Sequence, residues 1–341
     1  MACESRSRPT GSSRRRSCRF PCPSPRIDNP SHKRDWLSRF RELDEPFEAR
    51  HRRAAERLAA QGSISQVYVA ILGLRSDVID FRFPEEVAKL QRVVDPPGEL
   101  ELAGALKDRA LFGAIGRYSH GITHELAVRT EVDTRGGTDV AWWIIGALRL
   151  RTQAELLIPA MSDHSWSTIA GITDGSCDVR LLEDFPQARV LGKSRVVTSE
   201  DLTWVADNLI TFAEQCRDKR FRLVVEALGT YHHSPNSRLM TAQLWAGIEA
   251  LAGADSETTF RLSSYLAAYL EPRGQGRLDS FARISKLYGI RSKAVHGAEI
   301  ADEKLAEHVL EVRELLARLL IACIENGRIP SRRDFETALF S

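Results

Sequence analysis

The segment from Arg291 to His296 places one permanent cation and one titratable imidazole five residues apart. Arginine can bind a phosphate group through two parallel hydrogen bonds. Histidine takes up and releases protons near neutral pH, so it can act as a general base. Together these residue types suit attack on a phosphodiester bond of RNA. The segment is short, with Gly289 just before it and Gly297 directly after it.

Such a reaction requires neither a metal nor another cofactor, because RNA carries its own nucleophile in the 2′-hydroxyl group. His296 would remove the proton of that hydroxyl, and Arg291 would offset the negative charge that develops on the phosphate. Attack within the RNA molecule already supplies proximity, and the expected product is a 2′,3′-cyclic phosphate. Ser292 and Lys293 are expected to contribute locally. A single Arg/His pair lacks a general acid for the leaving 5′-oxygen.

A second interpretation gives the same residues a structural role. Arg291 would be a cation at a helix end, paired with Glu249 or another carboxylate. His296 would lie at the C-terminal end of a helix, where the helix dipole favours positive charge. Two roles remain open for Glu249. It would orient Arg291, because a buried charge must be paired, or it would simply lie at the surface.

The charge of the chain is unevenly distributed. The 341 residues carry a net charge of +2. Residues 1–35 hold nine Lys/Arg and three Asp/Glu, whereas the remainder holds 39 Lys/Arg (48 − 9) and 43 Asp/Glu (46 − 3), a net charge of −4. This slightly acidic remainder argues against a broad basic surface for nucleic acid, so any such site must be local.

Residues 1–35 are rich in Ser, Arg and Pro and poor in large apolar side chains, which predicts a disordered basic tail. A mistranslated upstream segment is an alternative, and prolines disfavour an organellar transit peptide. Cys18 and Cys22 form a CxxxC pair without matching metal ligands. The remaining cysteines are scattered, which fits a reducing compartment and a cytoplasmic protein. The longest apolar run, Val140 to Leu148, is too short for a membrane span of about 20 residues.

From about 36 to 197 the pattern is mixed and predicts an α+β domain. Strands are expected around Val67–Ile71 and Val78–Phe83, and more weakly at Leu156–Ile158 and Val190–Val197. Alternation from Leu126 to Val132, followed by a Gly-containing turn, predicts a hairpin. A helix is expected to begin near Asp44–Pro46, after a stripe formed by Trp36, Phe40 and Leu43, and to run to Gly62.

From 198 to 341 the apolar spacing is helical and predicts a bundle. One helix should begin at Thr198–Asp201 and continue to about Leu228. Further helices are expected at about 238–252, 256–270, 278–288 and 302–325, with a stop at Asn326-Gly327. The Arg291–His296 segment would therefore lie between the last two long helices.

These residues resemble the HEPN superfamily, with the Apea-like HEPN domains as the most similar branch, over about residues 200–326. Three ordered segments carry the resemblance: Leu244–Leu251, Phe260–Leu266 and Leu287–Gly297. The resemblance implies an all-α bundle that dimerises and, in many members, a metal-independent endoribonuclease. Arg291 and His296 match its Arg-x4-His motif, and Glu249 matches a recurring acidic position. Ser292 differs from the Asn, Asp or His that follows the arginine in many catalytic members.

Two histidine pairs offer other chemistry. His120 and His124 have the i, i+4 spacing of helical metal ligands, but Gly and Thr between them disfavour a helix and no third ligand is evident. His232 and His233 precede Ser-Pro and are expected in a solvated loop. The loop Arg273–Arg277 lacks the strand-loop-helix context of a phosphate-binding loop. We therefore expect no metal and no cofactor.

The sequence thus predicts a homodimeric HEPN ribonuclease that acts on single-stranded RNA, with a toxin or antiviral defence role. Its N-terminal domain would sense a trigger or hold the nuclease in check, and a regulatory protein is a further candidate partner. The alternative is a non-catalytic HEPN module that binds RNA, a nucleotide or a protein partner. A third interpretation makes the N-terminal domain the enzyme, although it shows no nucleophile elbow, Walker motif or metal-ligand set.

Overall fold

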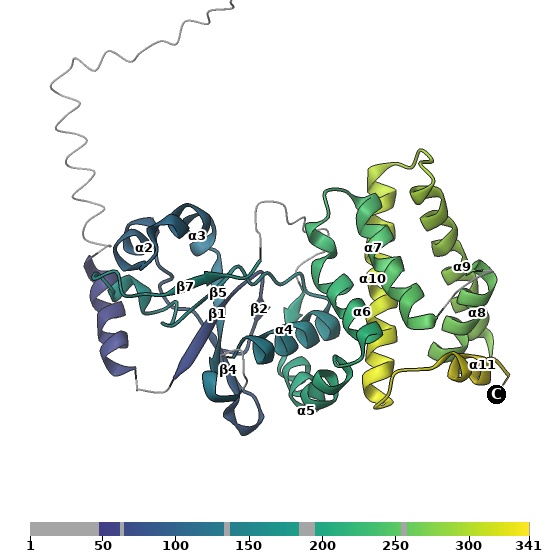
Figure 1. Ribbon diagram of the computed structural model, residues 1–341, viewed down its shortest axis with the longest axis horizontal. Helices are drawn as coiled ribbons and strands as arrows, with labels where there is room; N and C mark the ends of the chain where they lie inside the picture. Colours follow the sequence, from purple (N-terminus) through teal and green to yellow (C-terminus); the bar gives the residue numbers. More distant parts are fainter. Residues whose placement is uncertain (1–47, 62–64, 133–136, 184–194, 254–257, 341) are drawn as a thin grey trace, which may run out of the picture. The chain divides into compact units, whose positions relative to one another are not determined.

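The computed structural model describes residues 48–61, 65–132, 137–183, 195–253 and 258–340. An antiparallel sheet with flanking helices occupies residues 48–197, and only helices follow from 199 to 340 (Figure 1). The predicted order of an α+β region followed by a helical region is confirmed. The predicted tail (1–35), the stripe of Trp36, Phe40 and Leu43, and the helix start at Asp44–Pro46 lie outside the described residues.

The central sheet has six strands in the order β3-β4-β5-β1-β6-β7, and every neighbouring pair is antiparallel. A separate parallel pair joins β2 to β8. The six strands are β1 (Gln66–Leu72), β3 (Asp80–Arg82), β4 (Ala88–Arg92), β5 (Ile122–Arg129), β6 (Ala160–Ser162) and β7 (Val179–Leu181), and the short pair is β2 (Arg75–Ser76) with β8 (Val196–Val197).

Strand β1 is buried on both faces because both sets of its alternating side chains find apolar partners. Val69 and Ile71 join one hydrophobic cluster, whereas Tyr68 and Ala70 join a second. The second cluster includes apolar residues of α2 (Glu99–Ala105) and α3 (Phe112–Ser119). The first cluster takes in α4 (Thr138–Thr152) and extends through the helical region to Phe335. The change of secondary structure at residue 198 therefore does not divide the hydrophobic core.

The predicted hairpin after Leu126–Val132 is wrong. Strand β5 pairs with β1 and β4, the next residues form a short 3-10 turn, and the chain enters α4 at Thr138. The apolar run that begins at Val140 forms this helix, which packs against β5 and also against α5, α6 and α10 (Figure 1). Burial of this segment against several elements therefore determined that the chain continues as a helix, which the local alternation of side chains did not predict. The expected strand at Leu156–Ile158 is reduced to one bridge between Leu157 and Leu72.

The helical region contains α5 (Ser199–Gln215), α6 (Lys219–Thr230), α7 (Ser237–Ala252), α8 (Thr258–Leu270), α9 (Gln275–Val295), α10 (Asp302–Glu325) and α11 (Arg332–Phe340). The predicted helix start at Thr198–Asp201 is confirmed, and these two residues form a capping box at the start of α5. The expected single helix to Leu228 is wrong, because the Asp218 side chain accepts the backbone N–H groups of Arg220 and Phe221 and begins α6. The sequence did not predict α11, whose Phe335 stacks on Tyr265.

No helix within the described ranges has the length and apolar character needed to cross a bilayer.

Candidate functional site

Arg291 lies in the last two turns of α9, and His296 is the residue that caps this helix. The predicted position between two helices is therefore corrected, because α9 continues through Gly289 to Val295. Gly297 ends the helix with a φ of +79°, and the Ala298 N–H donates to the Lys293 carbonyl. This is a Schellman motif, in which a left-handed residue is most easily supplied by glycine.

Arg291 is held by two side chains that the fold brings to it. Its Nη2 lies 3.1 Å from Glu249 Oε1 and 3.2 Å from Oε2, and Tyr288 donates its hydroxyl to Glu249 Oε1 at 3.1 Å. The Arg291 guanidinium also lies over the Tyr288 ring, 5.4 Å from its centroid. Arg291 and Glu249 are 24% and 23% exposed at their side chains, so the pair faces solvent on one side. Arg291 Nε, by contrast, is buried and has no hydrogen-bond partner within the described part of the chain.

The support behind this pair comes from a buried aromatic contact. Trp245 on α7 meets the Tyr288 ring edge-on at 5.1 Å, and its indole N–H donates to His308 on α10 at 3.4 Å. Trp245 and His308 are fully or almost fully buried. Helices α7, α9 and α10 together therefore fix the position of Tyr288, which in turn orients Glu249 and Arg291.

Arg238 holds the end of α9 in place. Located in the first turn of α7, it donates from Nη1 to the Ala294 carbonyl at 2.9 Å and from Nη2 to the Ala298 carbonyl at 2.6 Å. These two carbonyls flank His296 along the chain. Arg238 thus holds the backbone on both sides of His296, and the sequence pattern did not single this arginine out.

Arg291 and His296 do not contact each other directly. Residues five positions apart on an α-helix are separated by about 140° around its axis, and no hydrogen bond or ion pair joins these two side chains among the described residues. Within the same ranges, the side chains of Ser292 and Lys293 likewise have no such partner. Their carbonyls accept the backbone N–H groups of His296 and Ala298. The Arg-x4-His segment therefore presents a fixed cation and an exposed imidazole on different sides of one helix end.

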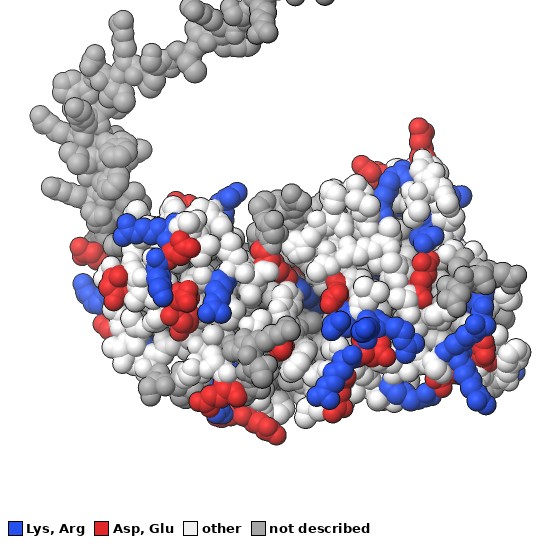
Figure 2. Space-filling model, in the orientation of Figure 1, with Lys and Arg blue, Asp and Glu red and all other residues white. Residues whose placement is uncertain are grey.

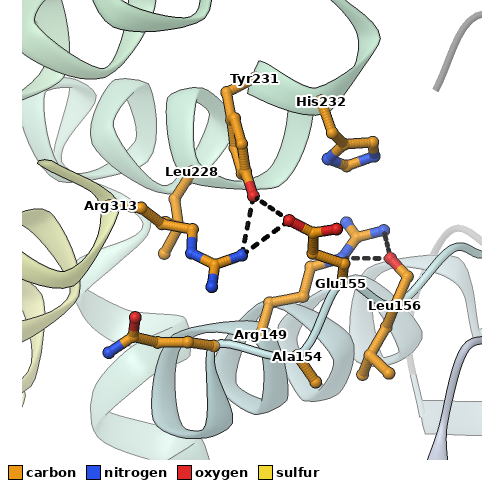
Figure 3. A pocket seen from close by; sticks show the side chains of 9 residues that line it. Arg149, Ala154, Glu155, Leu156, Leu228, Tyr231, His232 and Arg313 are labelled. Carbon is orange, nitrogen blue, oxygen red and sulfur yellow. Dashed lines mark hydrogen bonds and ion pairs between the residues drawn. The ribbon is translucent and has the colours of Figure 1, made fainter. Parts of the chain in front are cut away.

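A second polar cluster lies where α4 meets α6 and α10, and the sequence did not predict it (Figure 3). Arg149 donates to the Leu156 carbonyl and lies 2.6 Å from Glu183 Oε1. Arg313 on α10 lies 3.0 Å from Glu155 Oε1 and donates to the Tyr231 hydroxyl at 2.8 Å. Arg149 within the apolar helix α4 was the sequence signal that could have revealed this cluster.

His232 belongs to this cluster, so the expectation that it lies in a solvated loop is wrong. It is only 4% exposed, and its Nε2 has no hydrogen-bond partner among the described residues. Burial, followed by the charges of Arg149, His233 and Arg313, lowers the pKa of His232 to about 3. Burial likewise lowers the pKa of His308 to about 4. Both histidines are therefore neutral in the folded protein near pH 7.

These buried histidines predict a loss of stability on acidification. Between pH 6.5, the ordinary histidine value, and about pH 4, the unfolded chain binds protons that the folded chain does not. The free energy of unfolding should therefore fall as the pH decreases through this window, by up to about 1.4 kcal/mol per pH unit for each histidine. Urea unfolding of the wild type and of His232→Gln between pH 7 and pH 5 measures it. An unchanged pH slope in the variant would contradict the assignment.

His120 and His124 do not share a helix face. His120 ends α3 and His124 lies on β5, so the i, i+4 reading as helical metal ligands does not apply. The neighbouring Glu125 is fully buried and accepts hydrogen bonds from Gln91, Ser165 and the Trp166 backbone N–H. Burial raises the pKa of Glu125. These contacts give the His120–Glu125 stretch a structural explanation.

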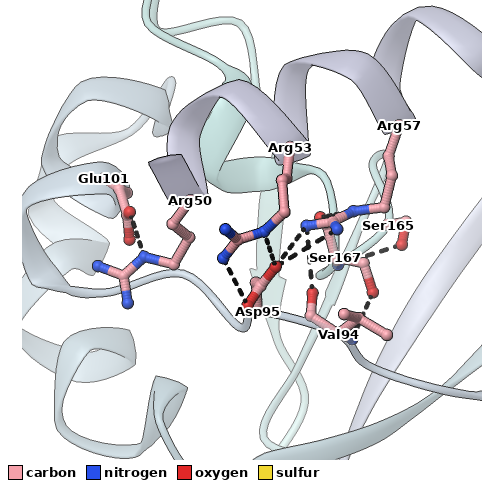
Figure 4. Close-up of polar contacts among 8 residues, drawn as sticks. All are labelled: Arg50, Arg53, Arg57, Val94, Asp95, Glu101, Ser165 and Ser167. Atoms are coloured by element: carbon pink, nitrogen blue, oxygen red, sulfur yellow. Dashed lines mark hydrogen bonds and ion pairs between the residues drawn. The ribbon is translucent and has the colours of Figure 1, made fainter. Parts of the chain in front are cut away.

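Arginines also form a row on the helix at residues 48–60 (Figure 4). Arg53 and Arg57 both pair with Asp95, and Arg50 pairs with the buried Glu101 at 2.6 Å. Arg57 also donates to the Ser167 carbonyl. The row is thus engaged in holding this helix to the loops that carry Asp95 and Ser167.

On the face drawn in Figure 2, basic side chains stand beside acidic ones and do not form one continuous basic surface. This agrees with the charge balance outside residues 1–35. An RNA would have to be recognised at a local site such as the end of α9.

No protein-family model, curated protein or solved structure matches this chain.

Proposed function

We propose that the helical region is a HEPN-type, metal-independent endoribonuclease whose site is the end of α9, with Arg291 and His296 as its catalytic residues. The observation that carries the proposal is the state of Arg291. Its guanidinium is fixed by Glu249 and Tyr288 and is partly open to solvent. A preorganised guanidinium of this kind can stabilise charge that develops on a phosphate.

The proposed reaction is an attack of the RNA on itself. The 2′-oxygen forms a bond to phosphorus, the bond from phosphorus to the 5′-oxygen breaks, and a 2′,3′-cyclic phosphate and a free 5′-hydroxyl result. Neutral His296 accepts the proton of the 2′-hydroxyl. Arg291 offsets the added negative charge of the phosphorane-like state. The 5′-oxygen takes a proton from a general acid that one Arg/His pair does not contain.

A homodimer would supply the missing group. Because Arg291 and His296 project about 140° apart from the axis of α9, they are poorly placed to meet one phosphate from the same chain. Two-fold pairing brings the end of α9 together with its copy. An arginine of one chain can then act with a histidine of the other, and the second histidine is available as the acid.

The region from 48 to 197 is proposed to regulate this site in response to a trigger or a regulatory protein. Helix α10 supports the idea, since it carries both Arg313, which contacts Glu155, and His308, which contacts Trp245. A shift at Glu155 could therefore reach the supports of Arg291 through one rigid helix. A cytoplasmic toxin or defence effector fits this arrangement by analogy with the family that the sequence resembles.

The second candidate function is a HEPN module that binds RNA, a nucleotide or a protein without cleaving it. The ion pair between Glu249 and Arg291 favours this alternative, because the carboxylate already offsets part of the positive charge. Ser292 at the position after the arginine points the same way.

Cleavage of a labelled single-stranded RNA with one 2′-deoxy position tests the proposed chemistry. We expect cuts at ribonucleotides and none after the deoxynucleotide, because that position lacks the nucleophile. Equal cutting at both positions would contradict attack by the 2′-hydroxyl. Binding without any cutting would favour the non-catalytic module.

A further inference from the structure

The ends of β6 and β7 bring three kinds of metal-ligand side chain together in the N-terminal region. Asp163 and His164 follow β6, and Cys177 lies two residues before β7. The backbone locks this junction, because the Asp163 N–H donates to the Asp178 carbonyl at 3.1 Å and the Asp178 N–H donates to Asp163 Oδ1 at 2.9 Å. The spacing in the sequence does not link these three residues, because 13 or more positions separate Cys177 from the other two.

The ligand atoms are close to one another. A carboxylate oxygen of Asp163, a ring nitrogen of His164 and the Cys177 sulfur all lie within 4.8 Å of each other, and His164 Nδ1 is 2.7 Å from Asp163 Oδ1. Cys177 is fully buried, whereas Asp163 and His164 are partly exposed at their side chains. The Cys177 sulfur therefore lies on the buried side of the group, and solvent can reach the side formed by Asp163 and His164.

The surroundings of the group are acidic. Asp178 follows Cys177 directly, and Asp174 is near enough for the His164 charge to contribute to lowering its pKa. Burial raises the pKa of the Cys177 thiol to about 12, and the charges of Asp163 and Asp178 act in the same direction. A cation at this position would be attracted by the carboxylates and would favour the thiolate.

We propose that Asp163, His164 and Cys177 bind one divalent transition-metal ion with the ligand preference of zinc. Zn²⁺ holds sulfur at about 2.3 Å and nitrogen or oxygen at about 2.0–2.2 Å, so its ligand atoms lie about 3.5 Å apart. Atoms near the 4.8 Å limit of the group must therefore move closer by about 1 Å, whereas His164 Nδ1 and Asp163 Oδ1, which are 2.7 Å apart, must give up their hydrogen bond and separate. Water completes the coordination on the exposed side. Thiolate and imidazole ligands favour zinc over magnesium or calcium.

A second group of three, formed by Glu183, His232 and His233, has similar spacing but the wrong electrostatics. Arg149 lies 2.6 Å from Glu183 Oε1, and the charges of Arg149 and Arg313 both act on His232. A metal ion there would be repelled by these cations, which is why the site at Asp163, His164 and Cys177 is the one that we propose.

A bound metal ion would link the two ends of the loop between β6 and β7. This loop carries Ser165 and Trp166, which bind Glu125, and Ser167, whose carbonyl accepts from Arg57. Through these contacts the loop holds both the central sheet and the helix at 48–60. Binding of a metal to the folded chain alone therefore stabilises the N-terminal region.

Titration of the reduced, metal-free full-length protein with Co²⁺ tests the site. The wild type should bind one ion with a thiolate-to-cobalt charge-transfer band in the near ultraviolet, and Zn²⁺ should abolish the band by displacement. His164→Ala, at a partly exposed position, should weaken binding at least tenfold, and Cys177→Ser should remove the band. Cys216→Ser, which changes a half-buried cysteine at the C-terminal cap of α5, should leave the band unchanged.

Thermal unfolding gives a second readout that does not depend on sulfur. Zn²⁺ should raise the Tm of the wild type and of Cys216→Ser, but not that of His164→Ala. Absence of the cobalt band in the wild type would overturn the proposal. A band that persists in Cys177→Ser, or equal affinity in His164→Ala and the wild type, would place the metal elsewhere in the chain and would overturn it as well.

Discussion

Replacing Arg291 with alanine is expected to lower the rate of RNA cleavage by about 10²–10³-fold, and replacing His296 by about 10²–10⁴-fold. The first change removes the cation that offsets phosphate charge, and the second removes the general base. Neither change should unfold the protein. His296 is exposed, and the partly exposed ion pair of Arg291 with Glu249 contributes about 1 kcal/mol or less. Initial rates with single-stranded RNA, compared at equal protein concentration, measure both effects.

Arg283→Ala provides the matched control. Arg283 lies on the same helix and is ion-paired with Glu311 and Glu314, but it is well exposed and precedes the end of α9 by more than two turns. Its replacement should leave the cleavage rate within about twofold of the wild type, because it removes a surface charge away from the site. Similar losses in Arg283→Ala and Arg291→Ala would indicate a general electrostatic effect and would contradict a specific role for Arg291.

Mixing the two inactive variants tests whether one site combines residues of two chains. If Arg291 of one copy acts with His296 of the other, half of the dimers formed from Arg291→Ala and His296→Ala are mixed, and each of these keeps one such Arg/His pair but lacks the second histidine. Activity should then return measurably, but to less than one quarter of the wild-type value, because the general acid is missing. If both residues act from the same chain, mixing restores none. Light scattering that gives a monomer near 38 kDa at micromolar concentration would contradict the dimer.

Arg149→Ala is expected to lower the free energy of unfolding by about 3–5 kcal/mol, because it leaves a buried carboxylate without its cation. The side chains of Arg149 and Glu183 are only 6% and 5% exposed, and Arg149 also donates to the Leu156 carbonyl. Urea unfolding monitored by circular dichroism measures the loss.

Two comparisons make this result specific. Arg222→Ala breaks an exposed pair with Glu226 and should cost less than about 1 kcal/mol. The double variant Arg149→Met and Glu183→Leu removes both buried charges and should recover most of the stability that Arg149→Ala loses. Equal losses of unfolding free energy in Arg149→Ala and Arg222→Ala would show that the buried ion pair contributes no more to stability than the exposed one.

The helices were largely predictable from the sequence because their signals are local. The capping box at Thr198 and the stop at Asn326-Gly327 gave bounds that the structure confirms within a residue. Gly289 was misleading, since a glycine costs an exposed helix only about 1 kcal/mol and α9 continues through it. The left-handed Gly297 is the true end of that helix.

The polar clusters were much less predictable because the fold assembles them from distant segments. Arg149, Glu183, His232 and Arg313 come from separate elements, and no spacing rule links them. The pair of Glu249 and Arg291 was among the sequence predictions only because both positions match the family resemblance. Arg238 holds the end of α9 through hydrogen bonds to backbone carbonyl groups. Because every residue has a backbone carbonyl, the residue types at the end of α9 do not indicate this contact.

Cleavage of single-stranded RNA by the purified wild-type protein in excess EDTA tests the central claim most directly, when the new RNA ends are identified at the same time. We predict cleavage that EDTA does not prevent, with 2′,3′-cyclic phosphate and 5′-hydroxyl ends. Complete loss of cleavage in EDTA with recovery on adding metal, or ends that carry a 5′-phosphate, would contradict a metal-independent site at Arg291 and His296.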